Sequence, residues 1–207
     1  MAETPSFKNR HNEEIQLPDK RTIWLSRACA VVVHVTLYDT LSGQWYILLG
    51  KRGEGTPDFQ GYWGLPCGYL DWDETLTQAM IREVWEECGV YLPSIIQSEQ
   101  YVWSKNSCVT HTDNFHETPW AIADTPRHQK QNISMHYAVQ FAWAGQPFPA
   151  LTDEHAEPGE VAGIEWVPLE KALEMDLAFN HAARINELVN TKREWFDEVE
   201  NANNSAR

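Results

Sequence analysis

The amino-acid sequence predicts an α+β fold formed by a single domain. Two neighbouring segments near the start, and another past the middle, are rich in β-branched and aromatic residues, as β-strands are. The segment between them has the spacing of an amphipathic helix. The chain has 207 residues, 43% of them hydrophobic, which suits one sizeable core better than two complete domains.

The first elements are a polar arm and a β-hairpin. Residues 1–22 are polar, and the sequence predicts no regular structure for them. Residues 28–39 (ACAVVVHVTLYD) and 44–52 (QWYILLGKR) follow, and the turn sequence TLSG between them indicates that they pair as a hairpin. A glycine-rich loop, GEGTPDFQGYWGLPCGYLD, comes next.

The most regular segment is a helix predicted over residues 75–89. The acidic residues Asp71, Asp73 and Glu74 precede it and favour its positive N-terminal end, and Gly89 is a typical C-terminal stop. This helix separates the predicted hairpin from the second half of the sequence.

The second half combines strands, long loops and helices. Strands are predicted around 95–104 and 133–144, and the polar stretch 105–132 between them is long enough to indicate a functional or mobile loop. The acidic loop EHAEPGEVAG leads into a short strand, IEWVP. PLEKALEM and HAARINELVNTKREWFDEVE are predicted to be helices, and NANNSAR a frayed tail.

The composition disfavours several classes of protein. With 16 basic and 30 acidic residues the formal net charge is −14, whereas nucleic-acid binding needs a basic surface. No stretch approaches the ~20 apolar residues of a membrane span, and the polar start lacks the apolar core of a signal peptide. We therefore expect a cytoplasmic protein. Its four cysteines form no C-x-x-C pair, so we expect free thiols.

Three carboxylates of the predicted helix lie close together. On an ideal helix Glu83, Glu86 and Glu87 share an arc of about 100°. The neighbouring arc is apolar and comprises Ile81, Val84, Trp85 and Cys88. An amphipathic surface helix is one interpretation. A divalent-cation site is the other, because three like charges with no cation among them repel one another, and carboxylates suit Mg²⁺ or Mn²⁺.

The segment GYLDWDETLTQAMIREVWEECGV resembles the signature of the Nudix hydrolases. That signature is Gly, five residues, Glu, seven residues, Arg-Glu, an aliphatic residue, any residue, Glu-Glu, any residue, Gly and an aliphatic residue. The matching positions are Gly68, Glu74, Arg82, Glu83, Val84, Glu86, Glu87, Gly89 and Val90. The resemblance is sharp over about 50–90, softer over 28–49 and 133–180, and absent from 1–27 and from the last helix.

The resemblance implies an organisation and an activity. The fold would be an α/β/α sandwich with a mixed sheet over residues 23–180, preceded by the arm 1–22 and followed by a C-terminal helix and tail over 181–207. The activity would be hydrolysis of a nucleoside diphosphate linked to another moiety, with Mg²⁺ or Mn²⁺. The expected partner is a nucleotide-derived small molecule, with no nucleic acid and no membrane, and the chain is compatible with a homodimer.

Carried over by position, the resemblance assigns roles to the helix and its preceding loop. Glu83, Glu86 and Glu87 would bind the metal. Glu74 and Arg82 would brace the turn at Gly68 through an ion pair. The carbonyl of Cys67 would be a further ligand, although the family pattern usually has glycine there and a Cβ restricts the backbone.

A general base must collect the proton of the attacking water. Family members often place an acidic residue in a loop downstream of the signature, and Glu157 and Glu160 match that placement. We favour Glu160 because it immediately precedes an apolar strand, and an acidic solvated loop is the alternative for each. If neither loop residue is the base, Glu83 and Glu86 are the next candidates.

Three residues outside the signature are candidates for substrate binding. Arg52 ends the second predicted strand and is placed to reach a phosphate, with a surface ion pair as the alternative. Trp63 adjoins the loop, with a core position as the alternative. Arg127 lies in the polar 105–132 stretch and would bind an anionic substrate. The alternative is a solvent-exposed arginine without a role, because that stretch would be exposed in any case.

Two further interpretations of function stay open. One is a non-catalytic Nudix-like sensor of a nucleotide sugar, which normally has an eroded signature and a basic DNA-binding segment. The other is an isoprenoid diphosphate isomerase, for which a reactive Cys67 would matter. The intact REVWEE favours hydrolysis over both. Downstream markers for ADP-ribose or dinucleoside polyphosphate enzymes are absent from positions 104–107, so the leaving group is not identified.

Overall fold

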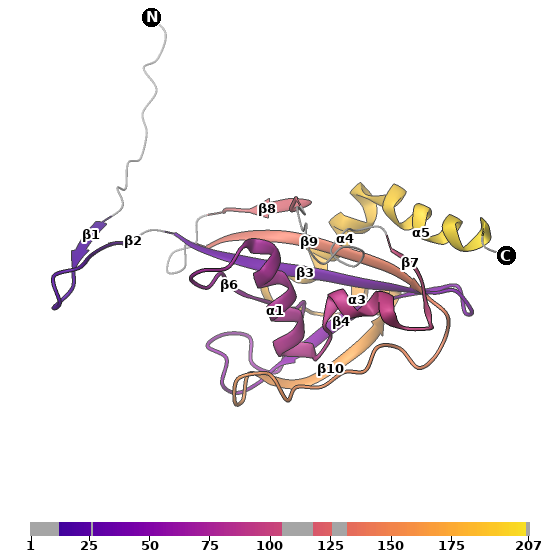
Figure 1. The fold of residues 1–207 in the computed structure, drawn as a ribbon, viewed down its shortest axis with the longest axis horizontal. Helices are drawn as coiled ribbons and strands as arrows, with labels where there is room; N and C mark the ends of the chain where they lie inside the picture. The colour runs from indigo at the N-terminus through magenta and orange to yellow at the C-terminus, as the bar shows by residue number, and fades with distance from the viewer. Residues whose placement is uncertain (1–12, 26, 105–117, 126–131, 206–207) are drawn as a thin grey trace, which may run out of the picture.

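The computed structural model describes residues 13–25, 27–104, 118–125 and 132–205. A mixed sheet forms its centre (Figure 1). The main strands, in order across the sheet, are β10 (Val161–Pro168), β4 (Gln44–Arg52), β3 (Ala28–Asp39), β9 (Asn132–Trp143) and β7 (Tyr101–Ser104). Strands β3 and β9 run parallel, and the other pairs are antiparallel. The predicted α+β class and the β3–β4 hairpin are both confirmed.

Helices cover both faces of the sheet. They are α1 (Leu76–Cys88), α3 (Leu169–Glu174), α4 (His181–Thr191) and α5 (Arg193–Ser205), with 3-10 turns at η1 (Leu92–Gln97) and η2 (Ala178–Asn180). Alternate residues of β3 point to opposite faces, as expected for a strand. Val31 and Val33 pack with α1 in one core, and Val32 packs with α4 in the other. The sandwich follows from this alternation.

The structure corrects several sequence expectations. The predicted strand at 95–104 begins with η1, where Pro93 lies in the first turn, and only its end is strand. The single predicted C-terminal helix is two helices that meet at Lys192. The helical conformation also continues to Ser205, into the predicted tail. The glycine-rich loop contains two short strands, β5 (Trp63–Gly64) and β6 (Cys67–Tyr69).

An additional hairpin precedes the sheet. Strands β1 (Glu13–Gln16) and β2 (Thr22–Leu25) pair with each other and stand away from the central sheet (Figure 1). Part of the polar arm therefore has regular structure. A last short strand, β8 (Ala121–Ala123), pairs with β9.

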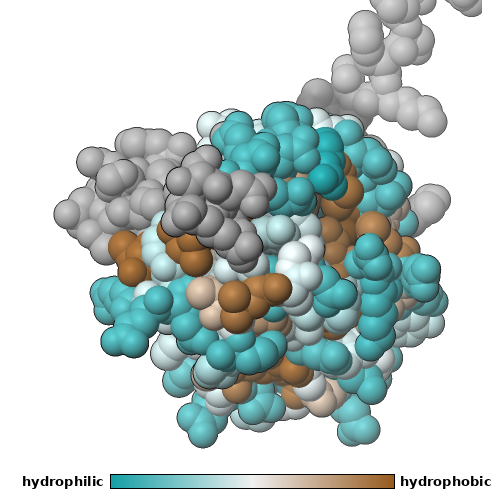
Figure 2. Space-filling model, turned by 90° about the vertical axis from the view of Figure 1, so that its right-hand side faces the viewer, coloured by the Kyte–Doolittle hydropathy of each residue, from teal (hydrophilic) through white to brown (hydrophobic). Residues whose placement is uncertain are grey.

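Hydrophilic residues dominate the surface drawn in Figure 2, and apolar side chains gather there only in small separate patches. This agrees with the formal net charge of −14. Across the part of the chain that the structure describes, no helix has the length and apolar character needed to cross a membrane.

Local interactions fix both ends of α1. Thr75 caps the N-terminus by accepting a hydrogen bond from the Gln78 amide, and the Gln78 side chain accepts one from the Thr75 amide. Gly89 ends the helix in the left-handed conformation at φ 72°, where its amide donates to the Trp85 carbonyl. The helix that carries the carboxylates is therefore held at both termini.

Candidate active site

Two of the three candidate carboxylates of α1 are buried rather than solvated. Glu83 and Glu87 are only 6% and 7% exposed, because the loop that precedes α1 covers that side of the helix. Trp85, which helical periodicity places in the apolar arc, is instead 38% exposed. The interpretation of α1 as a simple amphipathic surface helix is therefore wrong.

Arg82 connects the loop to the helix. Its guanidinium donates two hydrogen bonds to Glu74, at 2.8 and 3.0 Å, and one to the Tyr69 carbonyl at 2.9 Å. Its Nη1 donates to Glu83 Oε1 at 2.7 Å and to Glu86 Oε2 at 2.9 Å. These bonds raise the pKa of Arg82 and lower that of Glu74. One cation thus neutralises part of a cluster of three carboxylates.

This geometry predicts that Arg82→Ala lowers both stability and turnover. The substitution leaves Glu74 and Glu83 without their cation, and unpaired, poorly solvated carboxylates are costly, so we expect a loss of about 1–3 kcal/mol in unfolding free energy. The control Arg193→Ala removes an exposed pair with Asp197 on α5 and should cost less than about 1 kcal/mol. A melting shift in Arg82→Ala with unchanged metal affinity and turnover would contradict a role in the site.

Position 68 requires glycine because the Glu83 carboxylate lies very close to the backbone there. A Cβ at this position would collide with the Glu83 carboxylate. Since a glutamate side chain is flexible, Gly68→Ala should displace the carboxylate rather than unfold the protein. We expect metal affinity to fall by about tenfold or more, while the unfolding free energy changes by less than about 1 kcal/mol. Equal metal binding by the variant and the parent, measured by calorimetry, would disprove this.

Cysteine is accommodated next to Gly68. Cys67 lies in the extended strand β6 opposite Val32, a conformation open to any residue, so its Cβ poses no difficulty. The Cys67 amide donates to Glu87 Oε2 at 3.2 Å. Burial raises the pKa of the Cys67 thiol well above its usual value, so the thiol stays protonated. The unreactive thiol does not support the isomerase interpretation.

The electrostatics of the cluster favour a bound cation. Burial raises the pKa of Glu83 to about 7, although Arg82 opposes the shift. Burial, with Glu83 and Glu160 nearby, raises the pKa of Glu87 well above its ordinary value. Carboxylates that are costly to ionise in a protein interior are stabilised by a nearby cation. Carboxylate and carbonyl oxygens are also the ligands that Mg²⁺ and Mn²⁺ prefer.

The present side-chain arrangement is not that of a formed metal site. Among the described residues, no group of three or more His, Cys, Asp or Glu side chains is arranged to hold a metal ion. Glu83 and Glu86 both point to Arg82 instead. The donor chemistry fits the ion, and binding would require the glutamates to exchange Arg82 for the metal.

The pKa of Glu83 predicts a pH dependence. A carboxylate whose pKa rises from 4.5 to about 7 on folding contributes stability below pH 4.5 that is lost as the pH rises through 7. Metal affinity should rise over the same range as the proton leaves. Burial lowers the pKa values of His136 and His181, so these two residues reduce the stability of the fold as the pH falls below 6.5. Melting curves in EDTA should therefore differ between the parent and Glu83→Gln from pH 5 to 8, and identical profiles would contradict the assignment.

The loop before β10 is attached to two elements of the site. The Gly53 amide donates to the Glu160 carbonyl at 2.7 Å, and the Gly55 amide donates to the Gly159 carbonyl at 2.8 Å. On α1, Trp85 stacks on His155 with ring centroids 4.0 Å apart and planes inclined by 19°. The loop is thereby fixed beside the carboxylates.

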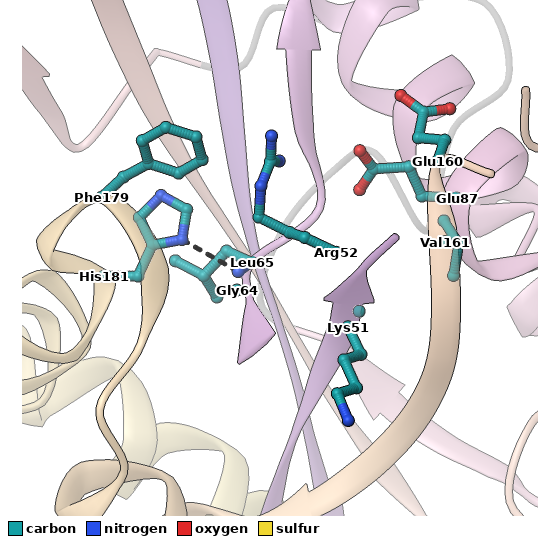
Figure 3. A pocket seen from close by; sticks show the side chains of 10 residues that line it. Lys51, Arg52, Gly64, Leu65, Glu87, Glu160, Val161, Phe179 and His181 are labelled. Carbon is teal, nitrogen blue, oxygen red and sulfur yellow. Dashed lines mark hydrogen bonds between the residues drawn. The ribbon is translucent and has the colours of Figure 1, made fainter. Parts of the chain in front are cut away.

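A cavity open to solvent adjoins the carboxylate cluster (Figure 3). The side chains that line it include Lys51, Arg52, Glu87, Glu160, Phe179 and His181. Arg52 and Glu160 are candidates from the sequence. Glu157, by contrast, is exposed, and its amide donates to Glu160 Oε2 at 3.2 Å. The structure thus brings one of the two loop glutamates to the cavity wall together with Glu87.

Sequence reasoning missed the opposite wall of the cavity. Phe179 lies in η2 and His181 begins α4, and neither belongs to a recognisable motif. The Leu65 amide donates to His181 Nδ1 at 3.0 Å, and burial lowers the pKa of His181 to about 3. His181 is therefore neutral at ordinary pH with its proton on Nε2.

The remaining substrate candidates lie elsewhere. Trp63 packs beside Gly163 at the edge of the second core, and it is the neighbouring Gly64 and Leu65 that line the cavity. Arg127 lies outside the described residues. The structure thus brings together Arg52, Glu87 and Glu160.

Three residues near the cavity have unusual backbone conformations. Phe59, Phe179 and Asn180 have φ values of 55°, 54° and 67°. Left-handed conformations are uncommon for bulky side chains, and each costs on the order of 1–3 kcal/mol. Such strain persists only where the surrounding structure holds it.

The fold is a mixed sheet covered by helices on both faces, and the candidate site is a cluster of glutamates on α1 beside a pocket that Arg52 lines. A family model for the NUDIX domain matches residues 29–188, so the chain belongs to the NUDIX family. The resemblance seen in residues 68–90 is thereby confirmed.

Known structures have the same fold. The NUDIX domain of Shewanella oneidensis NrtR complexed with ADP ribose is 21% identical, with a TM-score of 0.53 over 80% of this chain and 88% of that chain. M. smegmatis RenU, a Nudix hydrolase, is 18% identical, with a TM-score of 0.52 over 88% of this chain and 95% of its own.

A bifunctional NMN adenylyltransferase/ADP ribose pyrophosphatase from Francisella tularensis, complexed with AMP and a Mn ion, is 21% identical. It has a TM-score of 0.54 over 80% of this chain, which spans only 42% of that protein. At these identities the likeness establishes the fold alone.

Proposed function

We propose that the protein hydrolyses the diphosphate bond of a nucleoside diphosphate linked to another moiety, with Mg²⁺ or Mn²⁺ as cofactor. The observation that carries the proposal is the buried carboxylate pair, Glu83 and Glu87, of which Glu87 lines a pocket together with Arg52. A purely structural helix would not retain two buried carboxylates with raised pKa values.

The cofactor would be held by Glu83, Glu86, Glu87 and the Cys67 carbonyl. When bound, a divalent cation neutralises the diphosphate charge, lowers the pKa of water and stabilises the leaving phosphate oxygen. Arg52 projects into the cavity and would bind a phosphate oxygen. Arg82 would fix the position of the loop relative to the carboxylates through its hydrogen bonds to Glu74 and to the Tyr69 carbonyl.

Glu160 is proposed as the general base. It shares the cavity wall with Glu87, and its backbone carbonyl is fixed by the Gly53 amide. In this role its carboxylate takes a proton from the attacking water. Glu157 remains the alternative in the same loop, and Glu83 and Glu86 are the alternatives on α1.

The experiment is a turnover screen of nucleoside diphosphate derivatives with Mg²⁺ and with EDTA. Hydrolysis of at least one compound, abolished by EDTA, supports the proposal. Tight binding without turnover would indicate a non-catalytic sensor, and conversion of isopentenyl diphosphate would indicate an isomerase. The homodimer and the cytoplasmic location remain predictions.

A further inference from the structure

The walls of the cavity differ in chemistry along its length. Figure 3 shows Glu87 and Glu160 on one side, Arg52 between, and Phe179 with His181 on the other. The acidic side suits cations and the diphosphate they accompany, and Arg52 suits a phosphate oxygen. The aromatic side lies beyond Arg52 and offers no charge to a phosphate. It suits a planar, uncharged group attached to the diphosphate.

Two phenylalanines meet at this aromatic side. The ring centroids of Phe59 and Phe179 are 4.7 Å apart with planes inclined by 61°. Both residues have left-handed backbones, and Phe59 is still 42% exposed. A strained conformation that leaves a large apolar ring in contact with solvent does not serve core packing. Strain of this kind is typical of ligand-binding positions.

Arg52 connects the aromatic side to the acidic side. Its guanidinium lies over the Phe179 ring, 4.6 Å from the centroid, and its Nε donates to the Asp58 carbonyl at 2.9 Å. The stacked position covers one face of the ring. An arriving phosphate attracts the guanidinium more strongly than a phenyl face does, since charge-assisted hydrogen bonds exceed cation–π attraction in strength.

We propose that Phe179 is the stacking platform for the base of the nucleotide substrate, and that it becomes available when Arg52 leaves the ring to bind phosphate. This inference rests on the proposed function, because it names the part of the substrate that the cavity recognises. Phe59 supports the platform edge-on. His181 offers an Nε2 proton that does not titrate at ordinary pH, and it donates to an acceptor atom of the base or ribose.

The test is binding of nucleoside monophosphates compared with ribose 5-phosphate. AMP, GMP, CMP and UMP each add a base to the same phosphate and ribose, so the ratio of dissociation constants isolates the base. We expect the parent protein with Mg²⁺ to bind at least one of them about tenfold more tightly than ribose 5-phosphate in calorimetry. Phe179→Leu should abolish that preference and leave ribose 5-phosphate affinity within about twofold.

Two comparisons separate stacking from folding. Phe179→Tyr retains an aromatic face and should retain the preference. Phe148→Leu is the matched control, since Phe148 packs on Tyr46 and Trp166 outside the cavity, and it should bind all five ligands like the parent. Melting curves of the three variants show whether each is folded.

The outcomes distinguish this inference from the proposed function. Equal affinity of the parent for ribose 5-phosphate and all four nucleotides would overturn the platform, as would a Phe179→Leu variant that keeps the preference. Neither result would affect hydrolysis in the turnover screen. Conversely, a base preference that depends on Phe179 in a protein without turnover would uphold the platform and refute the proposed hydrolase.

Discussion

Glu160→Gln should lower the turnover number by about 10²–10⁴-fold and leave the affinity for Mg²⁺ largely unchanged. The amide keeps the shape of the carboxylate and removes its capacity to accept a proton. Because the backbone of Glu160 is held by Gly53, we expect no comparable loss of stability. The measurement is steady-state kinetics from pH 5 to 9, in which the limb of the rate profile that reports the base should disappear.

Glu157→Gln is the matched control for this prediction. Glu157 lies in the same loop but is exposed, so its substitution should change turnover by less than about threefold. If Glu160→Gln is as active as the parent and Glu157→Gln is not, the two roles are exchanged. If both variants are fully active, the base is on α1.

Glu87→Gln should lower turnover by about a hundredfold or more, because loss of a positioned metal removes several kcal/mol of transition-state stabilisation. The same substitution should not destabilise the metal-free protein at pH 8. Glutamine can still accept the hydrogen bond of the Cys67 amide, and it removes a buried charge whose pKa is raised by burial. Opposite effects on activity and on stability would be difficult to attribute to misfolding.

Kinetics and thermal melting in EDTA check this prediction, with Glu165→Gln as the control. Glu165 is an exposed glutamate of β10, and its substitution should affect neither property. A Glu87→Gln variant with near-full activity in Mg²⁺ would show that the carboxylate does not serve the metal.

The sequence predicts the part of the site that lies within one short segment, residues 68–90. Glu83, Glu86 and Glu87 occupy one helix, so the spacing alone places them together, and Gly68 and Arg82 follow from the same signature. Helical periodicity wrongly predicts that Trp85 is buried, because it considers only the hydropathy of each residue and not which face of the helix the neighbouring loop covers. The loop that carries Cys67 lies over the glutamate side of α1, and this long-range contact leaves Trp85 outside.

The aromatic wall of the cavity has no comparable signal. Phe179 and His181 meet Arg52 only because η2 and the start of α4 fold against the end of β4. Likewise, β5 and β6 are too short to show a period of two residues. The break at Lys192 between α4 and α5 has neither proline nor glycine to mark it.

The most direct test of the account measures turnover and bound metal in one Mn²⁺ titration, with occupancy determined by electron paramagnetic resonance. The substrate is the best compound from the turnover screen. We predict that turnover is absent in EDTA and rises in proportion to the metal bound, and that Glu87→Gln weakens both together. Turnover in EDTA equal to that at saturating Mn²⁺, or full metal binding by Glu87→Gln, would contradict the account.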